Sequence, residues 1–482
     1  MGREGQNWRE ECGVVGVANA RDAAQLACLV LHALQHRGQE SAGIAVADGH
    51  TLATHKAMGL VADVFDESTL RPLTGTSAIG HVRYSTTGSS HLQNAQPIQV
   101  TSHRGAAALA HNGNLVNAPE LRRMMEREGS IFSTTSDSEI ILHLVARSRE
   151  SAIEEALAEA LSRVRGAYSL VVLTRDRLLA ARDPNGFRPL CLGRCGDSYV
   201  VCSESCGLDI VGGTFLRDVA PGELLVIEKG GLRSHRLVPP ARETCCVFEH
   251  IYFSRPDSRV FGENVNKVRR ACGEILGRES PATADVVCAV PDSSNTAALG
   301  YAQASGISFE LGLIRNHYVG RTFISPAQNV RDMSVRIKFN PVKELIEGKR
   351  IVLVDDSIVR GTTMRKLVKI IRAAGAAEVH LRIASPPITH PCYYGIDTPV
   401  RNELIASSHS VEEIATYMRV DSLRYLSLQG LLQATGAAER FCTACFTGEY
   451  PLPFDEELDD KEIFDHEAGK REVVVPRSRR RL

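Results

Sequence analysis

The segment IVLVDDSIVRGTT, residues 351–363, limits the fold of this chain more than any other stretch. An apolar strand ends in two acidic residues, and a short loop leads through Gly361 into a helix that begins at Thr362 and Thr363. Strand-like runs such as DVVCAV and AEVHLRIAS lie on either side of it and alternate with the helical runs TAALGYAQAS and TTMRKLVKIIRAAG. This alternation predicts a parallel sheet with right-handed crossovers, in a domain that begins near Arg242.

The end of that apolar strand is a candidate ligand site. Ligands of parallel α/β sheets bind beyond the carboxyl ends of the strands, and a helix N-terminus offers its N–H groups to a phosphate. Asp355 and Asp356 lie where they can bind ribose hydroxyl groups or a hydrated Mg²⁺. For two aspartates alone, an acidic strand end before a capped helix is the simpler interpretation. The order of the whole segment makes that interpretation the weaker one. The motif GxxxxGK[ST] of ATP-type P-loops and the dinucleotide-binding motif GxGxxG are both absent, so these two kinds of phosphate site lose their main support.

The first half of the chain has a different pattern. From Cys12 to about Pro240, short β-rich runs alternate with turn signals. Helical segments interrupt them at Ala23–Leu34 and Ser138–Arg163, the second with apolar residues at helical spacing. The pattern predicts sheets packed with helices in one domain.

Cys12 begins the strand-like run CGVVGV after eleven mostly polar residues. Taken alone, it is best explained as a small packing residue, since unpaired cysteine is usually buried. The alternative is that the chain is cut before Cys12, which leaves a thiol and an α-amino group on one residue. An α-amine has a pKa of about 8 and suits the role of base toward a thiol. Residues 1–11 contain no apolar stretch, so they are not a secretory signal peptide, and a cleaved propeptide remains open.

Three further motifs of the first half have both a structural and a chemical interpretation. Arg83, at the end of the strand-like run GHVRYST, can bind an α-carboxylate through two parallel hydrogen bonds. AHNGN favours a hairpin turn, but Asn112 and Gly113 can also form an oxyanion hole. TTSDSE favours a helix N-cap, but Asp137 can also accept an ammonium group. Together with the thiol of Cys12, these groups make a site for glutamine.

The order of these features, with LQHRGQES and DPNGFRP, resembles the class II glutamine amidotransferases, whose mature chains begin with the catalytic cysteine. Residues 351–363 resemble the phosphoribosyl pyrophosphate (PRPP) loop of type I phosphoribosyltransferases. From Cys12 to about Pro451 the chain thus resembles the amidophosphoribosyltransferase family. The resemblance implies a chain of α/β and α+β class with these parts: a propeptide at 1–11, an N-terminal-nucleophile hydrolase αββα sandwich at 12–241, a type I phosphoribosyltransferase α/β domain with a parallel sheet at 242–453, and a charged, flexible tail at 454–482.

The same resemblance implies the chemistry of both halves. The Cys12 thiolate would attack glutamine, Asn112 and Gly113 would hold the oxyanion, and Arg83 and Asp137 would bind the substrate. Ammonia would pass through an internal tunnel to PRPP and give 5-phosphoribosylamine, glutamate and pyrophosphate, the first step of purine synthesis. The implied PRPP-binding residues are Asp355, Asp356, Ser357, Gly361, Thr362, Thr363, Arg321 and Lys338. The implied magnesium ligands are Ser293, Asp355 and Asp356.

The chain has 13 cysteines, an odd number that argues for reduced thiols in a cytosol and against a disulfide framework. The motif CTAC suits a redox pair, half of a zinc site or a pair of cluster ligands. One branch of the family carries a [4Fe-4S] cluster, and its ligand positions match Cys246, Cys392, Cys442 and Cys445. The resemblance therefore implies this cluster, with zinc as the alternative and with Cys245 as a rival to Cys246.

Charge and hydropathy limit the partners. The 56 Lys and Arg nearly cancel the 57 Asp and Glu, so the sequence predicts neither nucleic-acid nor membrane binding. No apolar run is long enough for a transmembrane helix, and we expect a soluble, cytoplasmic protein. The resemblance suggests a homotetramer inhibited by purine nucleotides. Two other interpretations are a base phosphoribosyltransferase with a degenerate amide domain, and a PRPP-binding regulator, for which no DNA-reading segment is evident.

Overall fold

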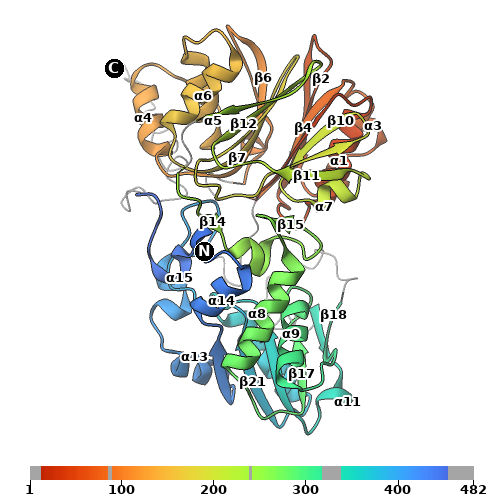
Figure 1. Cartoon of the computed structure of the whole chain (residues 1–482), viewed down its shortest axis with the longest axis vertical. Helices are drawn as coiled ribbons and strands as arrows, with labels where there is room; N and C mark the ends of the chain where they lie inside the picture. The colour runs from red at the N-terminus through yellow and green to blue at the C-terminus, as the bar shows by residue number, and fades with distance from the viewer. Residues whose placement is uncertain (1–11, 85–89, 238–240, 317–337, 454–482) are drawn as a thin grey trace, which may run out of the picture. The chain divides into compact units, whose positions relative to one another are not determined.

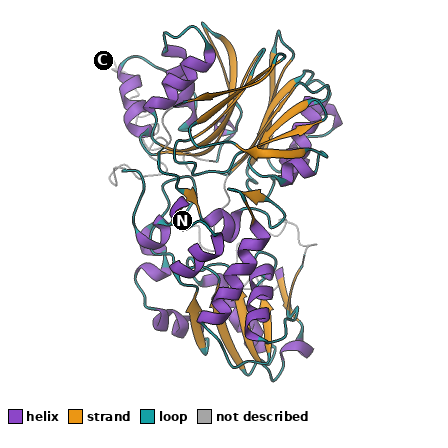
Figure 2. Ribbon diagram, in the orientation of Figure 1, coloured by secondary structure: helices purple, strands orange, loops and turns teal. Residues whose placement is uncertain are grey.

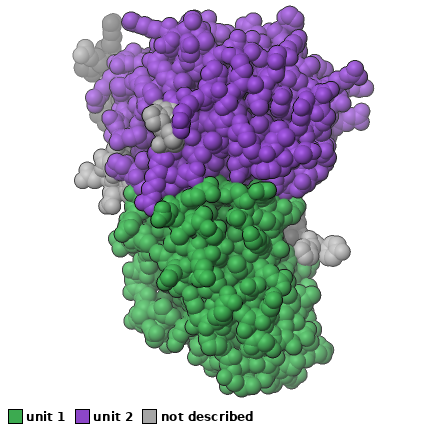
Figure 3. Space-filling view, viewed as in Figure 1, with its two compact units in different colours: residues 1–9, 246–392, 398–450 green, residues 10–245, 393–397, 451–482 purple. Residues whose placement is uncertain are grey.

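The computed structural model describes residues 12–84, 90–237, 241–316 and 338–453 (Figure 1). These residues form two compact units (Figure 3). The N-terminal unit contains residues 12–245, Tyr393–Asp397 and 451–453, and the C-terminal unit contains Cys246–Cys392 and Thr398–Tyr450. The chain passes from the first to the second after Cys245, close to Arg242, but no sequence pattern indicates that Tyr393–Asp397 belongs to the first unit.

Two antiparallel sheets form the centre of the N-terminal unit, with helices on both outer faces (Figure 2). The strand order is β11-β9-β10-β1-β4-β2-β3 in the first sheet and β13-β12-β8-β7-β6-β5 in the second. Successive side chains of a strand point to opposite faces. Val14 therefore packs against the second sheet, while Val15 packs against helix α1. This is the predicted αββα sandwich, and the prediction is confirmed.

The strands of the first sheet are β1 (Gly13–Ala18), β2 (Ser41–Ala47), β3 (Leu52–Met58), β4 (Ser77–Arg83), β9 (Cys191–Cys195), β10 (Ser198–Cys202) and β11 (Thr214–Asp218). The strands of the second are β5 (Ile98–Ser102), β6 (Gly105–Leu115), β7 (Gly166–Thr174), β8 (Leu178–Arg182), β12 (Glu223–Glu228) and β13 (Gly231–Arg236). The covering helices are α1 (Ala23–Ala33) on the first sheet and α4 (Ala118–Arg127), α5 (Ser138–Arg147) and α6 (Ile153–Arg163) on the second.

Two local predictions for this unit are wrong. The helix expected over Ser138–Arg163 is divided into α5 and α6, because Ser148 leaves the helical conformation and its hydroxyl accepts a hydrogen bond from the N–H of Glu150 at 3.2 Å. The hairpin turn expected at AHNGN is instead the end of a long strand. There Asn112 and Gly113 lie opposite Ser169 and Tyr168 of β7, since β6 continues along its partner for nine residue pairs.

The C-terminal unit contains the predicted parallel sheet, in the order β17-β20-β21-β22. Apolar residues of helix α12, among them Leu367 and Ile371, pack against sheet residues such as Leu353 in one buried core. The strands are β17 (Val286–Ala289), β20 (Arg350–Asp355), β21 (Glu378–Ile383) and β22 (Ser422–Tyr425). The longer helices are α8 (Val265–Glu279), α9 (Asn295–Ser305), α12 (Thr362–Ala373), α13 (Val411–Met418) and α14 (Leu428–Thr435).

Candidate active sites

Cys12 lies directly before β1, the central strand of the first sheet, and only 7% of it is exposed. Its thiol donates to the carbonyl oxygen of Tyr84 at 3.2 Å, and Arg37 Nε donates to the Cys12 carbonyl oxygen at 3.1 Å. Burial raises the pKa of the thiol to about 11, although the Tyr84 bond and the charge of Arg83 act in the opposite direction. At neutral pH the thiol is therefore protonated and needs a base before it can act as a nucleophile.

The two charged residues predicted to bind glutamine are buried near Cys12. Arg83 ends β4, and its Nη1 lies 3.6 Å from a carboxylate oxygen of Glu40. Asp137 Oδ2 accepts a hydrogen bond from the N–H of Leu115 at 2.9 Å. Asp137 precedes α5, yet its side chain makes no capping bond to that helix. Both charges influence the pKa of Cys12, Arg83 lowering it and Asp137 raising it, so both residues lie within electrostatic range of the thiol.

Asn112 has the least satisfied side chain of this site. It is fully buried, and neither its amide nitrogen nor its amide oxygen has a hydrogen-bond partner among the described residues. A buried amide without partners costs about 1–3 kcal/mol. The next residue, Gly113, has a φ of 152°, and a Cβ there would lie 2.0 Å from the carbonyl oxygen of Ala167. This position therefore requires glycine, and the unpaired amide beside it fits a ligand that exchanges hydrogen bonds with it.

In the C-terminal unit, Asp355 and Asp356 lie at the carboxyl end of β20, where serine hydroxyls meet their carboxylates. Ser294 Oγ donates to Asp355 at 2.8 Å, and Ser293 Oγ donates to Asp356 at 2.6 Å. Ser357 Oγ also donates to Asp356, at 2.6 Å. Burial raises the pKa of both carboxyl groups, and the charge of Asp356 raises that of Asp355 further. The pair therefore favours a cation in its vicinity.

The helix after this acid pair begins as the sequence indicates. Gly361 has a φ of 72° and directly precedes α12, which starts at Thr362 and Thr363. A Cβ at Gly361 would lie 2.8 Å from a side-chain carbon of Met418. Lys338 is exposed, and its carbonyl oxygen accepts from the N–H of Asn316 at 2.8 Å. The predicted Arg321 lies outside the described residues.

Four cysteines of the C-terminal unit come together from three parts of the chain. Cys246 and Cys442 lie on the paired strands β14 (Cys245–Cys246) and β23 (Phe441–Cys442). The carbonyl oxygen of Cys445 accepts from the N–H groups of Thr389 and His390, two residues that precede Cys392.

The thiols of this group are electrostatic neighbours. After burial, Cys442, Cys246 and Cys392 are the groups that raise the pKa of Cys445. As the side chains stand, no group of three or more His, Cys, Asp or Glu within the described ranges is arranged as a metal site. The thiol of the rival Cys245 accepts instead from Arg182 Nη2 at 3.7 Å, in the N-terminal unit.

Comparisons with known proteins identify the domains that carry the two candidate sites. Residues 81–209 match the glutamine amidotransferase domain, and residues 263–385 match the phosphoribosyl transferase domain. Amidophosphoribosyltransferase of Bacillus subtilis (strain 168) is 51% identical over 448 residues, which are 92% of this chain and 94% of that protein. The corresponding protein of Archaeoglobus fulgidus is 52% identical over 448 residues, 92% of this chain and 98% of its own. The chain belongs to the amidophosphoribosyltransferase family.

A solved structure of the family supports the fold. Glutamine PRPP amidotransferase from B. subtilis, in complex with ADP and GMP, superposes with a TM-score of 0.89 at 50% identity and covers 92% of this chain and 98% of that one. Amidophosphoribosyltransferases transfer ammonia from glutamine to PRPP, the first step of purine biosynthesis. This membership disfavours the two other interpretations, a base phosphoribosyltransferase and a PRPP-binding regulator. In the described part of the chain, no helix has the length and apolar character needed to cross a membrane.

A buried ion pair behind the amidotransferase nucleophile escaped the sequence analysis. Arg37 Nη1 lies 2.5 Å from Glu204 Oε1, and both side chains are fully buried. His36 Nε2 contacts the same oxygen at 2.7 Å. Arg37 belongs to the motif LQHRGQES, which indicated the family but not the ion pair with Glu204. Glu204 lies 167 residues further along the chain, so no local pattern links the two. Through Arg37, the pair fixes the carbonyl group of Cys12.

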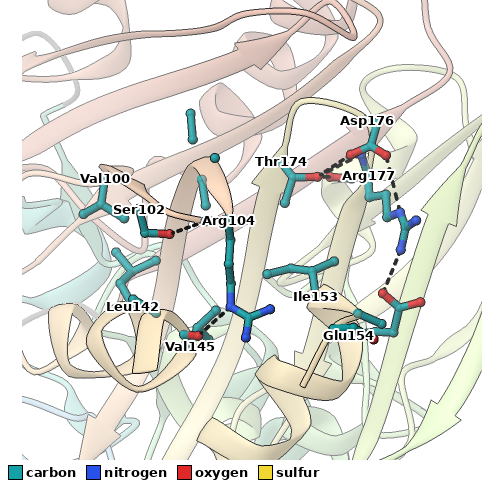
Figure 4. A pocket seen from close by; sticks show the side chains of 16 residues that line it. Val100, Ser102, Arg104, Leu142, Val145, Ile153, Glu154, Thr174, Asp176 and Arg177 are labelled. Atoms are coloured by element: carbon teal, nitrogen blue, oxygen red, sulfur yellow. Dashed lines mark hydrogen bonds and ion pairs between the residues drawn. The ribbon is translucent and has the colours of Figure 1, made fainter. Parts of the chain in front are cut away.

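A cavity of about 430 Å³ in the amidotransferase unit lies between the β5–β6 end of the second sheet and the start of α6 (Figure 4). None of the candidate site residues lines it. Its charged groups bind protein atoms: Arg177 pairs with Glu154 at 2.8 Å, and Arg104 donates to the carbonyl oxygen of Val145 at 3.1 Å. These charged groups are therefore engaged within the protein itself.

Proposed function

We propose that Cys12, freed at its amino group by removal of residues 1–11, hydrolyses glutamine and that the resulting ammonia aminates PRPP in the C-terminal unit. The observation that carries this proposal is the fully buried, unpartnered amide of Asn112, in a site that also holds a thiol and two opposite charges. Such an amide is stabilised when a substrate atom supplies the missing hydrogen bonds.

The chemistry follows from the groups present. The α-amine of Cys12 takes the thiol proton, and the thiolate attacks the carboxamide carbon of glutamine. The amide of Asn112 and the N–H of Gly113 stabilise the negative oxygen. Ammonia leaves, and water then cleaves the thioester to release glutamate. Arg83 binds the α-carboxylate of glutamine, and Asp137 binds its ammonium group.

Replacing Asn112 tests this assignment. We expect Asn112→Ala to lower kcat for glutamine hydrolysis about 100- to 1,000-fold, because one oxyanion donor is lost. Synthesis of phosphoribosylamine from added ammonia should stay within about twofold, since it does not need the thioester. Asn117→Ala is the matched control, because Asn117 is also a buried asparagine, but its side chain bonds to the backbone of Arg163 and Arg165. Unchanged glutamine hydrolysis in Asn112→Ala would contradict the proposal.

In the second unit we assign PRPP to the carboxyl end of β20. Asp355 and Asp356 would bind the ribose hydroxyls, while Ser357, Gly361, Thr362 and Thr363 would surround the 5′-phosphate at the start of α12. The oxygen donors Ser293, Asp355 and Asp356 fit Mg²⁺, which prefers oxygen ligands. Bound Mg²⁺ supplies positive charge that offsets the charge of the leaving pyrophosphate. Arg321 and Lys338 would contact that pyrophosphate, and ammonia would arrive through an internal tunnel.

The four cysteines of the C-terminal unit are proposed to hold a [4Fe-4S] cluster. Thiolates are the ligands such clusters require, and the effect of the three other thiols on the pKa of Cys445 supports a common ligand set. Zinc has the same donor preference and is the alternative metal. The cluster would tie together segments that lie almost 200 residues apart in the chain, Cys246 and Cys445.

The neighbouring pair Cys245 and Cys246 supplies the test. We expect Cys246→Ser to lose nearly all iron and acid-labile sulfide from anaerobically purified protein, because one of four ligands is gone. Cys245→Ser, the matched control, should retain both, since its thiol contacts Arg182. Elemental analysis and the visible absorption spectrum measure this. A colourless protein with one equivalent of zinc would replace the cluster by zinc, and iron loss in Cys245→Ser alone would exchange the two assignments.

We further propose a cytoplasmic homotetramer that purine nucleotides inhibit. Support comes from two solved relatives, one described with ADP and GMP and the other, at 50% identity and a TM-score of 0.89, as an allosteric regulatory enzyme of purine biosynthesis. The nearly balanced charge of the chain is consistent with the absence of nucleic-acid and membrane partners.

A further inference from the structure

The segment Tyr393–Asp397 lies in the N-terminal unit, although peptide bonds join it on both sides to residues of the C-terminal unit. It directly follows Cys392, one of the proposed cluster ligands. Tyr394 and Ile396 are almost completely buried, with 1% and 3% of their surface exposed. The segment is therefore packed into the N-terminal unit.

This segment packs against the part of β6 that holds Asn112 and Gly113. β5 pairs with β6 only as far as Leu109, and beyond it β7 is the one described strand that pairs with β6. Asn114 Nδ2 donates to the carbonyl oxygen of Tyr393 at 3.0 Å. A Cβ at Gly395 would lie 3.0 Å from Gly113 Cα. Gly113 thus has close backbone neighbours both in β7, at Ala167, and in Tyr393–Asp397.

Tyr394 anchors the segment. Its ring stacks on Phe187 with a centroid distance of 4.3 Å and an interplanar angle of 16°. Its carbonyl oxygen accepts from the buried Arg188 Nε at 2.8 Å. The carbonyl oxygen of Arg188 accepts in turn from Ser169 Oγ at 3.1 Å, and Ser169 lies opposite Asn112 in the sheet. The contacts of the segment therefore end on Gly113 and on Ser169, the strand partner of Asn112.

We propose that Tyr393–Asp397 is a positioning segment for glutamine hydrolysis, which fixes the backbone of Gly113 so that its N–H and the amide of Asn112 meet the developing oxyanion. This inference rests on the oxyanion-hole assignment made above. Oxyanion donors act through geometry, and a displacement of about 1 Å costs about 100-fold in rate. A small substitution at Gly395 should disturb Gly113 most directly, because no side chain separates the backbones of the two residues.

The test replaces Gly395 by alanine. Gly395→Ala places a methyl group against Gly113, and we expect kcat for glutamine hydrolysis to fall about 10- to 100-fold. The KM for glutamine and synthesis from added ammonia should change less than about threefold. Gly49→Ala is the matched control, because Gly49 has a similar φ, 97° against 108° at Gly395, but no atom within 4 Å of the added Cβ. It measures the backbone strain alone, and we expect normal glutamine hydrolysis.

A second readout separates positioning from a general structural defect. The Cys12 thiol adds to the aldehyde carbonyl of glutamate γ-semialdehyde, and the oxygen of the resulting adduct carries partial negative charge like the oxyanion. Glutamate forms no such adduct with the thiol. In Gly395→Ala, the inhibition constant of the aldehyde should rise in proportion to the loss of kcat/KM, and that of glutamate should stay constant. Equal weakening of both ligands, or normal hydrolysis, would overturn the positioning role. Normal hydrolysis in Asn112→Ala would instead overturn the oxyanion assignment itself.

Discussion

Cys12→Ala should abolish glutamine-dependent synthesis, by about 10,000-fold or more, and leave ammonia-dependent synthesis within about twofold of the unmodified enzyme. The nucleophile is lost, while the PRPP site at β20 remains intact. The variant should also keep residues 1–11 if Cys12 itself takes part in their removal, which intact mass measures directly. Initial rates with glutamine and with ammonium chloride, at the same PRPP concentration, give the comparison.

Cys28→Ala is the matched control for this experiment. Cys28 is as buried as Cys12, at 6% exposed, and burial raises the pKa of its thiol to about 11 as well. Cys28 lies in α1, however, and packs in the apolar core of the first sheet. We expect normal use of glutamine and normal alkylation of Cys12 by a diazo-ketone analogue of glutamine. A purified chain that still carries residues 1–11 and uses glutamine at full rate would refute the role of the α-amine.

The need for the α-amine follows from the surroundings of the thiol. The Cys12 thiol donates to the carbonyl oxygen of Tyr84, and the charges that act on it are those of Arg83, Glu40 and Asp137. In the proposed mechanism the two carboxylates take no part in removing the thiol proton, since Asp137 binds the ammonium group of glutamine and Glu40 pairs with Arg83. In these surroundings, with burial as the largest cause, the pKa of the thiol is raised to about 11, so the thiol is protonated at neutral pH. An amino group on the same residue has a pKa of about 8 and removes this obstacle at neutral pH. The Arg37–Glu204 pair would then keep Cys12 in place after the chain is cut.

Sequence patterns predicted the features that local chemistry determines. The end of β20, the glycine before α12 and the alternation of strands and helices follow from the order of apolar, acidic and glycine residues. The αββα sandwich followed from the family resemblance, which the fold confirms. These features need no information about distant segments.

The break between α5 and α6 at Ser148 is local, but one other error and two omissions arose where distant segments decide the conformation. Asn-Gly favours a turn, but β7 supplies a partner strand for Asn112 and Gly113 from more than 50 residues away. The segment Tyr393–Asp397 gives no sign in its own sequence of belonging to the N-terminal unit. Glu204 likewise meets Arg37 only after folding. In each case a tertiary contact overrides or adds to a local preference.

The second large effect concerns the acid pair. We expect Asp355→Asn to lower synthesis about 100-fold or more with glutamine and with ammonia alike, because both routes end at PRPP. Labelling of Cys12 by the glutamine analogue should be unchanged. Asp285→Asn is the control, since Asp285 is an exposed acid just before β17 that pairs with Arg350 at 2.7 Å. Steady-state rates with each nitrogen donor measure the effect, and a loss confined to glutamine would contradict the assignment.

The same substitution should not destabilise the free protein. Burial and the charge of Asp356 raise the pKa of Asp355 well above its ordinary value, so ionised Asp355 is unfavourable in the folded state at neutral pH. Asparagine removes that charge, and its side-chain oxygen can still accept from Ser294 Oγ and the N–H of Asp356. We therefore expect an equal or higher Tm without PRPP and Mg²⁺, together with the loss of activity. A substitution that removes activity and raises the Tm indicates a ligand site at that residue. If Asp355 had a purely structural role, its replacement would lower the Tm.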